Sequence, residues 1–374
     1  MEPNNPFLIS GYYSPKYFCD RQEETQTLLN ALQNGRNLTL VSPRRMGKTG
    51  LIKHTFYNLQ NTNSDIFVFY IDIFSTQSLA DFVRLFAATV LGKLDTMPQK
   101  AMARITKFIK SCRPTFTFDE ITGMPKVSIE LSPAQEEATL SEIFDYLQSS
   151  EKRCYIAIDE FQQITEYPEK GVEALLRSHI QFLSNVNFIF AGSKQHLMQE
   201  MFLSAQRPFY QSTQLLTIDS INIQPYYEFA HLFFLKIGKE LPEDVFSKIY
   251  QRFDGHTWYI QSVLNRLYGY NQDVTDETVE AAITEIIDEY SYTYESMYNL
   301  YPTGCQRLLK AIAQEEPVKE ILAGDFITRH QLKAASSVSS SLKKLMDNEL
   351  AYKSFKGYIV YDRFFSEWLR RQCF

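Results

Sequence analysis

The chain has 374 residues, 44% of them hydrophobic and 14% aromatic, and its formal net charge is −6. This length exceeds that of one ordinary core and predicts two or three domains, and the apolar content excludes a disordered chain. The mild charge excludes a wholly basic nucleic-acid-binding protein, although a local basic patch remains compatible with it.

Short apolar runs alternate with amphipathic stretches from about residue 20 to residue 220. The runs predict strands at 38–41, 66–71, 154–158, 187–191 and 214–218. The amphipathic stretches predict helices at 50–60, 78–94, 136–150, 170–184 and 195–202. Apolar strands separated by helices are typical of a mainly parallel sheet with both faces covered. We therefore predict an α/β fold with a doubly wound core over residues 1–221.

A candidate phosphate-binding loop, SPRRMGKT, lies at 42–49 between the first strand and the first of these helices. It matches the pattern G-x-x-x-x-G-K-[ST], except that Ser42 replaces the first glycine. Successive backbone N–H groups in such a loop bind phosphate, next to the positive end of the helix. Gly47 can adopt the unusual backbone angles required there. Lys48 is placed to bridge the outer phosphates, and the hydroxyl of Thr49 to ligate Mg²⁺.

The loop thus predicts binding of ATP and Mg²⁺, and the alternative is a basic turn that caps a helix. The residues expected to contact the nucleotide are Ser42, Pro43, Arg44, Arg45, Met46, Gly47, Lys48, Thr49 and Gly50. Because Pro43 limits the conformations of Ser42, a serine costs little there if its backbone remains in an ordinary region. Arg44 and Arg45 occupy variable loop positions, and we expect their side chains to face solvent or a partner.

The stretch PTFTFDEITGMPKVSIEL interrupts the alternation at 114–131. Two β-rich runs flank a turn at 122–125, a pattern that predicts a β-hairpin insertion in the core. The alternative is an irregular loop that lies on the core.

An acidic pair follows the apolar strand in CYIAIDEFQQI, at 154–164. A strand-end carboxylate can support Mg²⁺, and a second can take a proton from the attacking water. We assign the first role to Asp159 and the role of general base to Glu160. Asp72, at the end of FVFYID, is similarly placed and could face the metal. The alternative for the adjacent pair Asp159 and Glu160 is that they are solvated loop residues.

Two further polar residues are candidates for the reaction centre. The strand NFIFAGS ends in Ser193, which could sense the γ-phosphate or position water; the alternative is a simple turn. Arg207 follows in SAQRPFYQST, and a guanidinium near the γ-phosphate would stabilise charge in the transition state. It could act in cis or on a neighbouring subunit, or be a surface arginine.

The strand signal ends near residue 222. Helical periodicity follows at 225–238, 242–253, 258–268 and 275–298, which predicts a helical domain over 222–299. The last segment, 300–374, predicts helices followed by a short hairpin at 351–361.

The last segment is locally basic, with 12 Lys/Arg against 8 Asp/Glu in 300–374. In ASSVSSSLKKLMDNEL, one helix face carries Val338, Leu342 and Leu345. The outward positions are Ser339, Ser340, Lys343 and Lys344. A hairpin with Lys353 and Lys356 would lie beside them. The pattern of 336–361 suits contact with duplex DNA, because lysines bind phosphates and a helix can enter the major groove; the alternative is a lid or a protein-docking module.

Nothing in the sequence predicts export or a membrane span. The five cysteines are scattered without a CxxC pair or a Cys/His cluster, which argues against a disulfide framework or a zinc site. MEPNNPFLIS lacks the regions of a secretion signal, and polar residues interrupt the apolar stretch YYEFAHLFFLKIG. We expect a cytoplasmic protein without membrane contact.

The motifs, in this order, resemble those of the AAA+/STAND-like P-loop ATPases of the archaeal ATPase family, including a bacterial branch. The resemblance is carried by FCDRQEETQTLLNAL at 18–32, SPRRMGKTGLI at 42–52, YIAIDEFQQI at 155–164, FIFAGSKQHLM at 188–198, RPFYQ at 207–211 and GHTWYIQSVLNRL at 255–267. It implies an N-terminal ATPase core, a helical lid and a C-terminal winged-helix domain at 300–374. It also implies that Phe18, Arg21 and Glu24 lie near the base, and that the lid helix starting near Gly255 approaches the phosphates. This sequence departs from the family in Ser42, and in offering His256 rather than an arginine in the lid.

Together these features predict an ATP-hydrolysing molecular switch that acts on a protein or DNA partner or through self-association. The alternative is a nucleotide-binding, winged-helix DNA-binding regulator with little hydrolysis. A metabolic kinase is a weaker third interpretation, because no acceptor site for the phosphoryl group is apparent and the helical tail would have no use.

Overall fold

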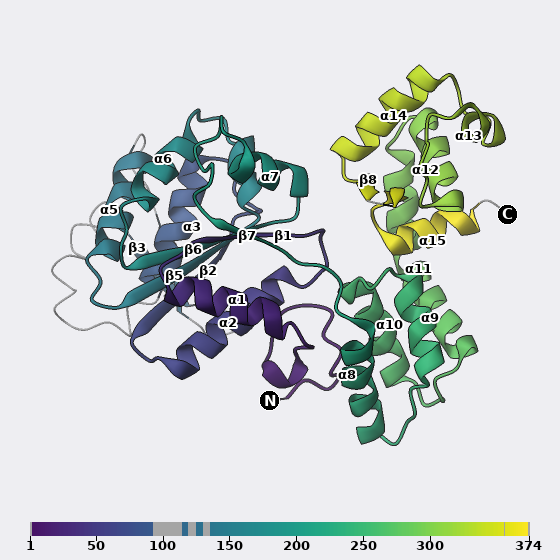
Figure 1. Cartoon of the computed structure of the whole chain (residues 1–374), viewed down its shortest axis with the longest axis horizontal. Helices are drawn as coiled ribbons and strands as arrows, with labels where there is room; N and C mark the ends of the chain where they lie inside the picture. Colours follow the sequence, from purple (N-terminus) through teal and green to yellow (C-terminus); the bar gives the residue numbers. More distant parts are fainter. Residues whose placement is uncertain (1, 93–113, 119–124, 130–134, 355, 373–374) are drawn as a thin grey trace. The chain divides into compact units, whose positions relative to one another are not determined.

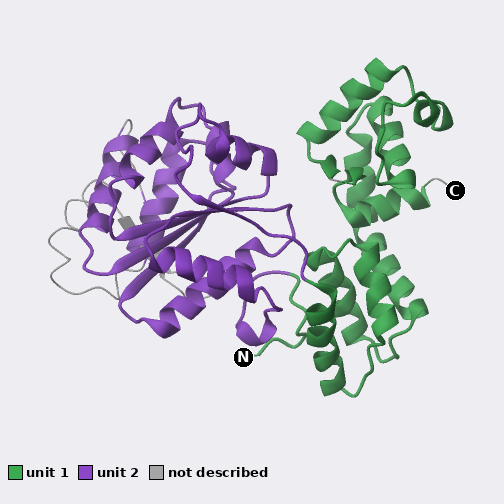
Figure 2. Cartoon of the chain, viewed as in Figure 1, with its two compact units in different colours: residues 1–9, 222–374 green, residues 10–221 purple. Residues whose placement is uncertain are grey.

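The computed structural model describes residues 2–92, 114–118, 125–129, 135–354 and 356–372 (Figure 1). It divides into two compact units, one comprising Ser10–Ile221 and the other Met1–Ile9 with Asn222–Phe374 (Figure 2). No helix among the described residues combines the length and the apolar character needed to cross a membrane.

A five-stranded parallel sheet forms the centre of the unit Ser10–Ile221. Its strands are β1 (Leu38–Val41), β2 (Ile66–Asp72), β5 (Arg153–Asp159), β6 (Val186–Gly192) and β7 (Gln214–Thr217). Their order in the sheet is β2-β5-β6-β1-β7, so β1 lies between two strands that are distant from it in sequence. The predicted α/β fold with a parallel sheet is confirmed.

Helices cover both faces of this sheet (Figure 1). They are α1 (Gln22–Gln33), α2 (Lys48–Thr62), α3 (Leu79–Leu91), α5 (Glu136–Gln148), α6 (Val172–Ile180) and α7 (Gln195–Leu203). Along β5, Ile156 and Ile158 pack in one apolar cluster with α3 and α5, whereas Tyr155 and Ala157 pack in the other with α1 and α2. Successive side chains of a strand point to opposite faces, so a strand buried on both faces needs a continuous apolar run.

Two shorter strands, β3 (Pro114–Phe118) and β4 (Pro125–Ile129), form a separate antiparallel sheet. They occupy the stretch in which we predicted a hairpin insertion, and their register pairs Phe116 with Val127. The turn between them lies outside the described residues.

The second unit begins with four helices, α8 (Ile223–Lys236), α9 (Glu243–Arg252), α10 (Thr257–Gly269) and α11 (Asp276–Asn299). The winged helix follows with α12 (Thr303–Glu315), α13 (Gly324–Arg329), α14 (Ala335–Asp347), β8 (Ala351–Ser354), β9 (Gly357–Val360) and α15 (Arg363–Arg371). β8 and β9 are antiparallel, and Val318 pairs with Tyr358 beside them. On α14, Val338, Leu342 and Leu345 are buried, as the helical spacing predicted. The predicted helical region and C-terminal winged helix are confirmed.

Residues 1–9 cluster with this second unit, whereas the sequence analysis assigned them to the core 1–221. The ring of Phe7 is fully buried and contacts Phe233, Phe234 and Tyr268. The amide of Asn265 donates a hydrogen bond to the carbonyl of Phe7 at 2.8 Å. The apolar run that Phe7 begins is only three residues long, FLI, which is too short to give a periodic signal, so the sequence did not reveal where this segment packs.

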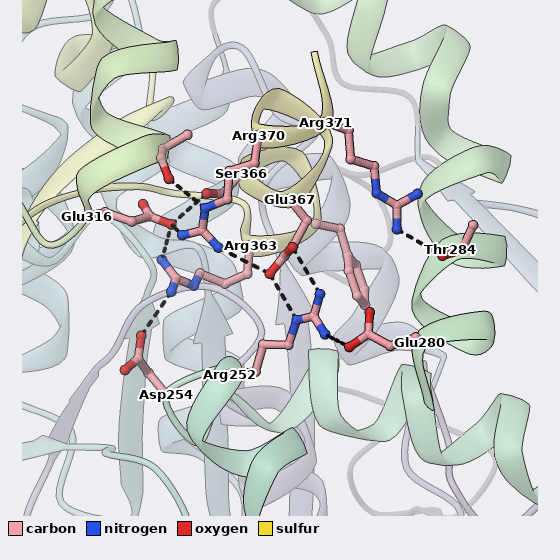
Figure 3. A network of polar contacts seen from close by, with 12 residues as sticks. Arg252, Asp254, Glu280, Thr284, Glu316, Arg363, Ser366, Glu367, Arg370 and Arg371 are labelled. Atoms are coloured by element: carbon pink, nitrogen blue, oxygen red, sulfur yellow. Dashed lines mark hydrogen bonds and ion pairs between the residues drawn. The ribbon is translucent and has the colours of Figure 1, made fainter. Parts of the chain in front are cut away.

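A buried carboxylate joins the parts of the winged helix (Figure 3). The side chain of Glu316 is only 1% exposed; it forms an ion pair with Arg363 Nη1 at 3.0 Å and accepts a hydrogen bond from Arg370 Nη2 at 2.8 Å. Ser366 Oγ and the backbone N–H of Val360 donate to the same carboxyl group, at 2.5 and 2.8 Å. Burying an ion is costly unless it is paired and hydrogen-bonded, a condition that the two arginines and the three hydrogen bonds satisfy.

A second carboxylate in this network connects α15 to α9 (Figure 3). Arg252 donates to both oxygens of Glu367, from Nε at 3.0 Å and from Nη2 at 3.1 Å, and also contacts Glu280 of α11. Burial acts to raise the pKa of Glu367, but hydrogen bonds and charge from Arg252 outweigh it and hold the pKa below its usual range. The winged helix is thereby fastened to the helices that precede it.

Replacing Glu316 with alanine should lower the free energy of unfolding by about 3–5 kcal/mol, because two guanidinium groups lose their buried partner. Chemical denaturation followed by circular dichroism measures this change. Glu320→Ala is the matched control, since Glu320 is an exposed glutamate four residues further along. A loss of less than about 1 kcal/mol in Glu316→Ala, the range of a surface ion pair, would contradict this account.

Candidate functional site

The segment 42–47 leads from the end of β1 directly into α2, whose first residue is Lys48. Gly47 has a φ of +91°, in the left-handed region where a side chain would be strained. Ser42 is fully buried, and its hydroxyl donates to the carbonyl of Pro43 at 3.0 Å. Its φ is not positive, so the serine that replaces glycine introduces no left-handed strain. The loop therefore forms despite this departure from the usual pattern.

The ammonium group of Lys48 is held by oxygens of the loop. The residue is 6% exposed, and Nζ donates to the carbonyls of Ser42 and Pro43, both at 3.2 Å. A buried ammonium needs such partners, and the oxygens of a phosphate could serve the same purpose. The geometry thus places a positive charge at the N-terminus of α2, where the helix dipole also favours an anion.

The carboxylate of Asp159 joins this loop to two strands. Its Oδ2 accepts from Thr49 Oγ1 at 2.8 Å and from the hydroxyl of Tyr70 at 2.7 Å. The backbone N–H of Glu160 donates to its Oδ1 at 3.0 Å, and Asp159 is 3% exposed. The register of β2 and β5 places Asp72 beside Asp159 at the same edge of the sheet. The structure therefore brings together Thr49, Asp159 and Asp72, as their positions in the sequence predicted.

The donors at this edge fit Mg²⁺ in their chemistry. Mg²⁺ prefers oxygen ligands and is usually bound through one or two carboxylates, with waters and substrate phosphates completing its shell. Thr49 and Asp159 offer a hydroxyl and a carboxylate whose oxygens lie 2.8 Å apart. Among the described residues no group of three His, Cys, Asp or Glu could hold a metal alone. Burial raises the pKa of Asp72, and the charges of Asp159 and Glu160 add to this rise, which a nearby cation would oppose.

Sequence reasoning missed Tyr70. Burial raises the pKa of its phenol, and the adjacent Asp159 carboxylate adds to the effect, so the hydroxyl remains a donor at neutral pH. In FVFYID, Tyr70 is two residues before Asp72 and on the same face of the strand. That spacing was the available signal, but a tyrosine in an apolar strand is usually assigned to the core.

Glu160 lies beside the loop and beside the end of β6. Its Oε2 accepts from Ser193 Oγ at 2.8 Å and from Gln162 Nε2 at 2.5 Å. Ser193 in turn accepts from Arg44 Nε at 3.3 Å, and the guanidinium of Arg44 lies over the ring of Phe74. We expected Arg44 to face solvent or a partner, but it contacts Ser193 within the site. Glu160 and Ser193 are brought together, as their places at two strand ends predicted, and Gln162 was missed.

The guanidinium of Arg207 pairs with residues outside the phosphate-binding loop. It forms ion pairs with Glu173 of α6 and, at 3.5 Å, with Glu200 of α7. Burial raises the pKa of Glu173, while the charge of Arg207 opposes that rise. Among the described residues, the side-chain ion pairs of Arg207 are with these two helices and not with the phosphate-binding loop.

The N-terminal segment of this unit lies against the loop. Arg21 is 5% exposed, and its guanidinium donates to the carbonyl of Met46 at 3.2 Å and pairs with Glu24 at 2.7 Å. The ring of Phe18 is close to Gly50, since a Cβ added at Gly50 would be 3.4 Å from it. The resemblance implied that this segment lies beside the nucleotide, and it does lie beside the loop.

Two aromatic residues complete this side of the loop. The ring of His54 stacks on Phe18 with centroids 4.3 Å apart, and Tyr12 shares a hydrogen bond with His54 Nδ1 at 3.0 Å. Burial lowers the pKa of His54, which favours its neutral form. The sequence analysis did not single out Tyr12 or His54, although the aromatic run YYSPKYF was a signal that this segment packs.

Comparison with known proteins agrees with this geometry. Residues 18–263 match the family described as "ATPase domain predominantly from Archaea", a match that covers more than half of the chain. The chain belongs to this ATPase family. Residues 292–371 match a second family, described as "Probable winged helix domain". The protein therefore has a P-loop ATPase domain of this family, which implies nucleotide binding, and a C-terminal winged helix.

Solved structures show the same fold at low sequence identity. A Walker-type ATPase of Pyrococcus abyssi is 16% identical with a TM-score of 0.67, over 98% of this chain and 99% of that chain. The ORC1 protein of Aeropyrum pernix, in complex with DNA, is 13% identical with a TM-score of 0.54, over 99% and 97%. The ORC2 protein of Aeropyrum pernix, in complexes with ADPNP and ADP, is 14% identical with a TM-score of 0.54, over 99% and 98%. No curated protein sequence gave a significant match.

Tyr70→Phe should weaken the binding of Mg·ATP by about tenfold, because Asp159 loses a donor that orients it. The affinity for ATP in excess EDTA should remain unchanged, since the phenol donates to the carboxylate of Asp159 and not to Lys48, which is assigned the phosphates. Titration with a fluorescent ATP analogue measures both affinities, and Tyr210→Phe, at an exposed tyrosine, is the control. Equal weakening with and without Mg²⁺ would show that Tyr70 does not act through the metal.

Proposed function

We propose that this chain hydrolyses ATP in a Mg²⁺-dependent reaction, and that the nucleotide state controls its interaction with a partner. The contact of 2.8 Å between Thr49 Oγ1 and Asp159 Oδ2 is the observation that carries the proposal. It joins the phosphate-binding loop to a strand-end carboxylate, and Glu160 follows that carboxylate directly. A phosphate group, a metal and a water molecule could meet at this edge.

Lys48 and the loop are assigned the binding of the phosphates. Lys48 Nζ would exchange the carbonyls of Ser42 and Pro43 for phosphate oxygens, and backbone N–H groups of 42–50 would bind the remaining oxygens. Thr49 and Asp159 would hold Mg²⁺, with Asp72 nearby. When bound, Mg²⁺ supplies neutralisation of charge on the phosphate oxygens. Phe18 and Arg21, which lie against the loop, are assigned to the nucleotide on the side of its base.

Glu160 is assigned the role of general base. Its carboxylate would orient a water molecule and accept its proton as the water attacks the γ-phosphate. Ser193, which donates to Glu160, would position the same water or the γ-phosphate. Arg207 would stabilise the transition state only after exchanging its ion pairs with Glu173 and Glu200, in cis or in a neighbouring subunit.

Phosphate release from Mg·ATP by the purified protein tests this assignment. Lys48→Ala should abolish both binding and release, because the phosphates lose their bridging charge. Glu160→Gln should retain binding and lower release at least about 100-fold, because an amide cannot accept the proton of water.

Lys194→Ala and Glu166→Gln are the matched controls, since these residues form an ion pair with each other at 3.5 Å. The two controls should hydrolyse ATP as the wild type does. If Glu160→Gln releases phosphate at the wild-type rate, Glu160 is not the base and the proposed mechanism is wrong. If the wild type binds ATP through Lys48 but releases no phosphate, the non-hydrolysing regulator is the better interpretation.

We propose that the remaining segments respond to the nucleotide, with 222–299 as a lid and 300–374 as an effector domain. The chain would then be a cytoplasmic switch of the STAND-like type, acting on a protein partner, on DNA or through self-association. The presence of a helical unit and a winged helix after the ATPase core supports this arrangement.

Duplex DNA is the partner favoured by the surface of the winged helix. The outward residues of α14, which are exposed, are Ser339, Ser340, Lys343 and Lys344. On the hairpin, Lys353 is exposed and lies over the ring of Tyr358, whereas Lys356 pairs with Asp254 at 3.6 Å. The ORC1 protein with the same fold is in complex with DNA. Lysines on a helix beside a hairpin can contact phosphates while the helix lies in the major groove.

Removing Lys343 and Lys344 together should weaken binding of a labelled duplex and reduce the slope of log affinity against log salt by about 2. Fluorescence anisotropy over a salt series measures both quantities. Lys319→Ala, at an exposed lysine on another segment of the winged helix, should change neither. Wild-type protein that binds no duplex, or a double variant with an unchanged slope, would exclude α14 as the DNA-contacting helix.

A further inference from the structure

The carboxylate of Glu160 is restrained from two directions at one oxygen. Gln162 Nε2 and Ser193 Oγ both donate to Oε2, at 2.5 and 2.8 Å. Gln162 belongs to η4 (Phe161–Glu166), the short helix that follows Glu160, whereas Ser193 follows β6. Among the described residues no hydrogen bond goes to Oε1, so the second oxygen is left to accept from water.

The backbone at Glu160 and at Gly192 allows the amide of Gln162 to reach the carboxylate of Glu160. Glu160 has a φ of 56° and lies at the N-terminal end of η4, so the chain turns sharply immediately after β5. Gln162 is 4% exposed, and its amide lies against Gly192. A Cβ at Gly192 would be 2.3 Å from Gln162 Oε1 and 2.6 Å from Met198 Sδ, so a larger residue would displace the amide.

Packing alone does not explain why a buried amide, that of Gln162, lies beside the carboxylate of Glu160. An apolar side chain would fill the same space without leaving polar atoms in the core. The amide of Gln162 instead orients its donor towards Glu160, because the carbonyl end would repel the carboxylate. The glycine at 192 leaves the space in which this orientation is held.

We infer that Gln162 is a positioning residue for the proposed general base, Glu160. The amide of Gln162 fits in this position because residue 192 is a glycine and has no side chain. This inference rests on the proposed function of Glu160. With Oε2 fixed by Gln162 and Ser193, Oε1 is presented in one direction, towards a water molecule that attacks the γ-phosphate. Gln162 itself is assigned no contact with the nucleotide or the metal, and acts through Glu160. Misplacement of a reacting group by about 1 Å can lower a rate about 100-fold, so one hydrogen bond that orients the carboxylate can matter greatly.

The decisive variant is Gln162→Leu, which keeps the size of the side chain and removes its donor. We expect kcat for ATP to fall about 10- to 100-fold, with KM and the affinity for a fluorescent ATP analogue within about twofold of wild type. Gln163→Leu is the matched control, because Gln163 is the adjacent glutamine of η4 and donates to the carbonyl of Thr76 at 3.1 Å. Its kcat should stay within about twofold of wild type.

A double-variant comparison separates positioning of Glu160 from a general effect on structure. If Gln162 acts through Glu160, adding Gln162→Leu to Glu160→Gln should lower kcat no further. Gly192→Ala tests the same inference in a second way, since it displaces the amide of Gln162 without removing it. It should also lower kcat and leave KM unchanged. If Gln162→Leu does not fold, Gly192→Ala and Gln162→Asn replace it in the test. The conservative variant Gln162→Asn should retain part of the wild-type kcat.

The outcomes distinguish this inference from the proposed function. Wild-type activity in Gln162→Leu or Gly192→Ala, together with inactive Glu160→Gln, would overturn the role of Gln162 and leave Glu160 as the base. Equal losses of nucleotide affinity and kcat would also overturn it, because they indicate a binding or structural effect. An active Glu160→Gln would instead overturn the proposed function on which the inference depends.

Discussion

The hydrogen bonds to Asp159 Oδ2 hold the site together. One donor is Thr49, in the first turn of α2, and the other is Tyr70 on β2, while Asp159 itself ends β5. Three elements that are far apart in the sequence therefore meet at one carboxylate. Because Asp159 is 3% exposed, its charge needs these donors, and losing one of them changes how the loop and the sheet are joined.

This carboxylate can occupy such a position because the sheet is parallel and buried on both faces. Continuous apolar strands fix the register of β2 and β5, and the register brings Asp72 and Asp159 to the same edge. The loop after β1 and the turn after β6 reach this edge as well, since all these strands run in one direction. Ligands of open α/β sheets bind at the carboxyl ends of the strands, and the polar residues of this chain gather there.

The sequence predicted those parts of the site that leave a pattern within a short stretch of residues, and it missed those that depend on distant residues. Strands, helices and the loop at 42–49 follow from apolar runs and fixed spacings, and so do Lys48, Thr49, Asp159 and Glu160. The tyrosine at 70 and the contact of Arg44 with Ser193 depend on which strands become neighbours, information that no local window contains. The same holds for Phe7, which packs on helices more than 200 residues away in sequence, as its contact with Phe229 illustrates.

The central claim is that Lys48, Thr49 and Asp159 form one site for a nucleotide and its metal. A crystal structure with Mg²⁺ and a non-hydrolysable ATP analogue tests this claim most directly. The account predicts that Lys48 Nζ leaves the carbonyls of Ser42 and Pro43 for phosphate oxygens, and that Mg²⁺ lies between Thr49 and Asp159. A nucleotide bound elsewhere, with Lys48 still donating to those carbonyls, would contradict it.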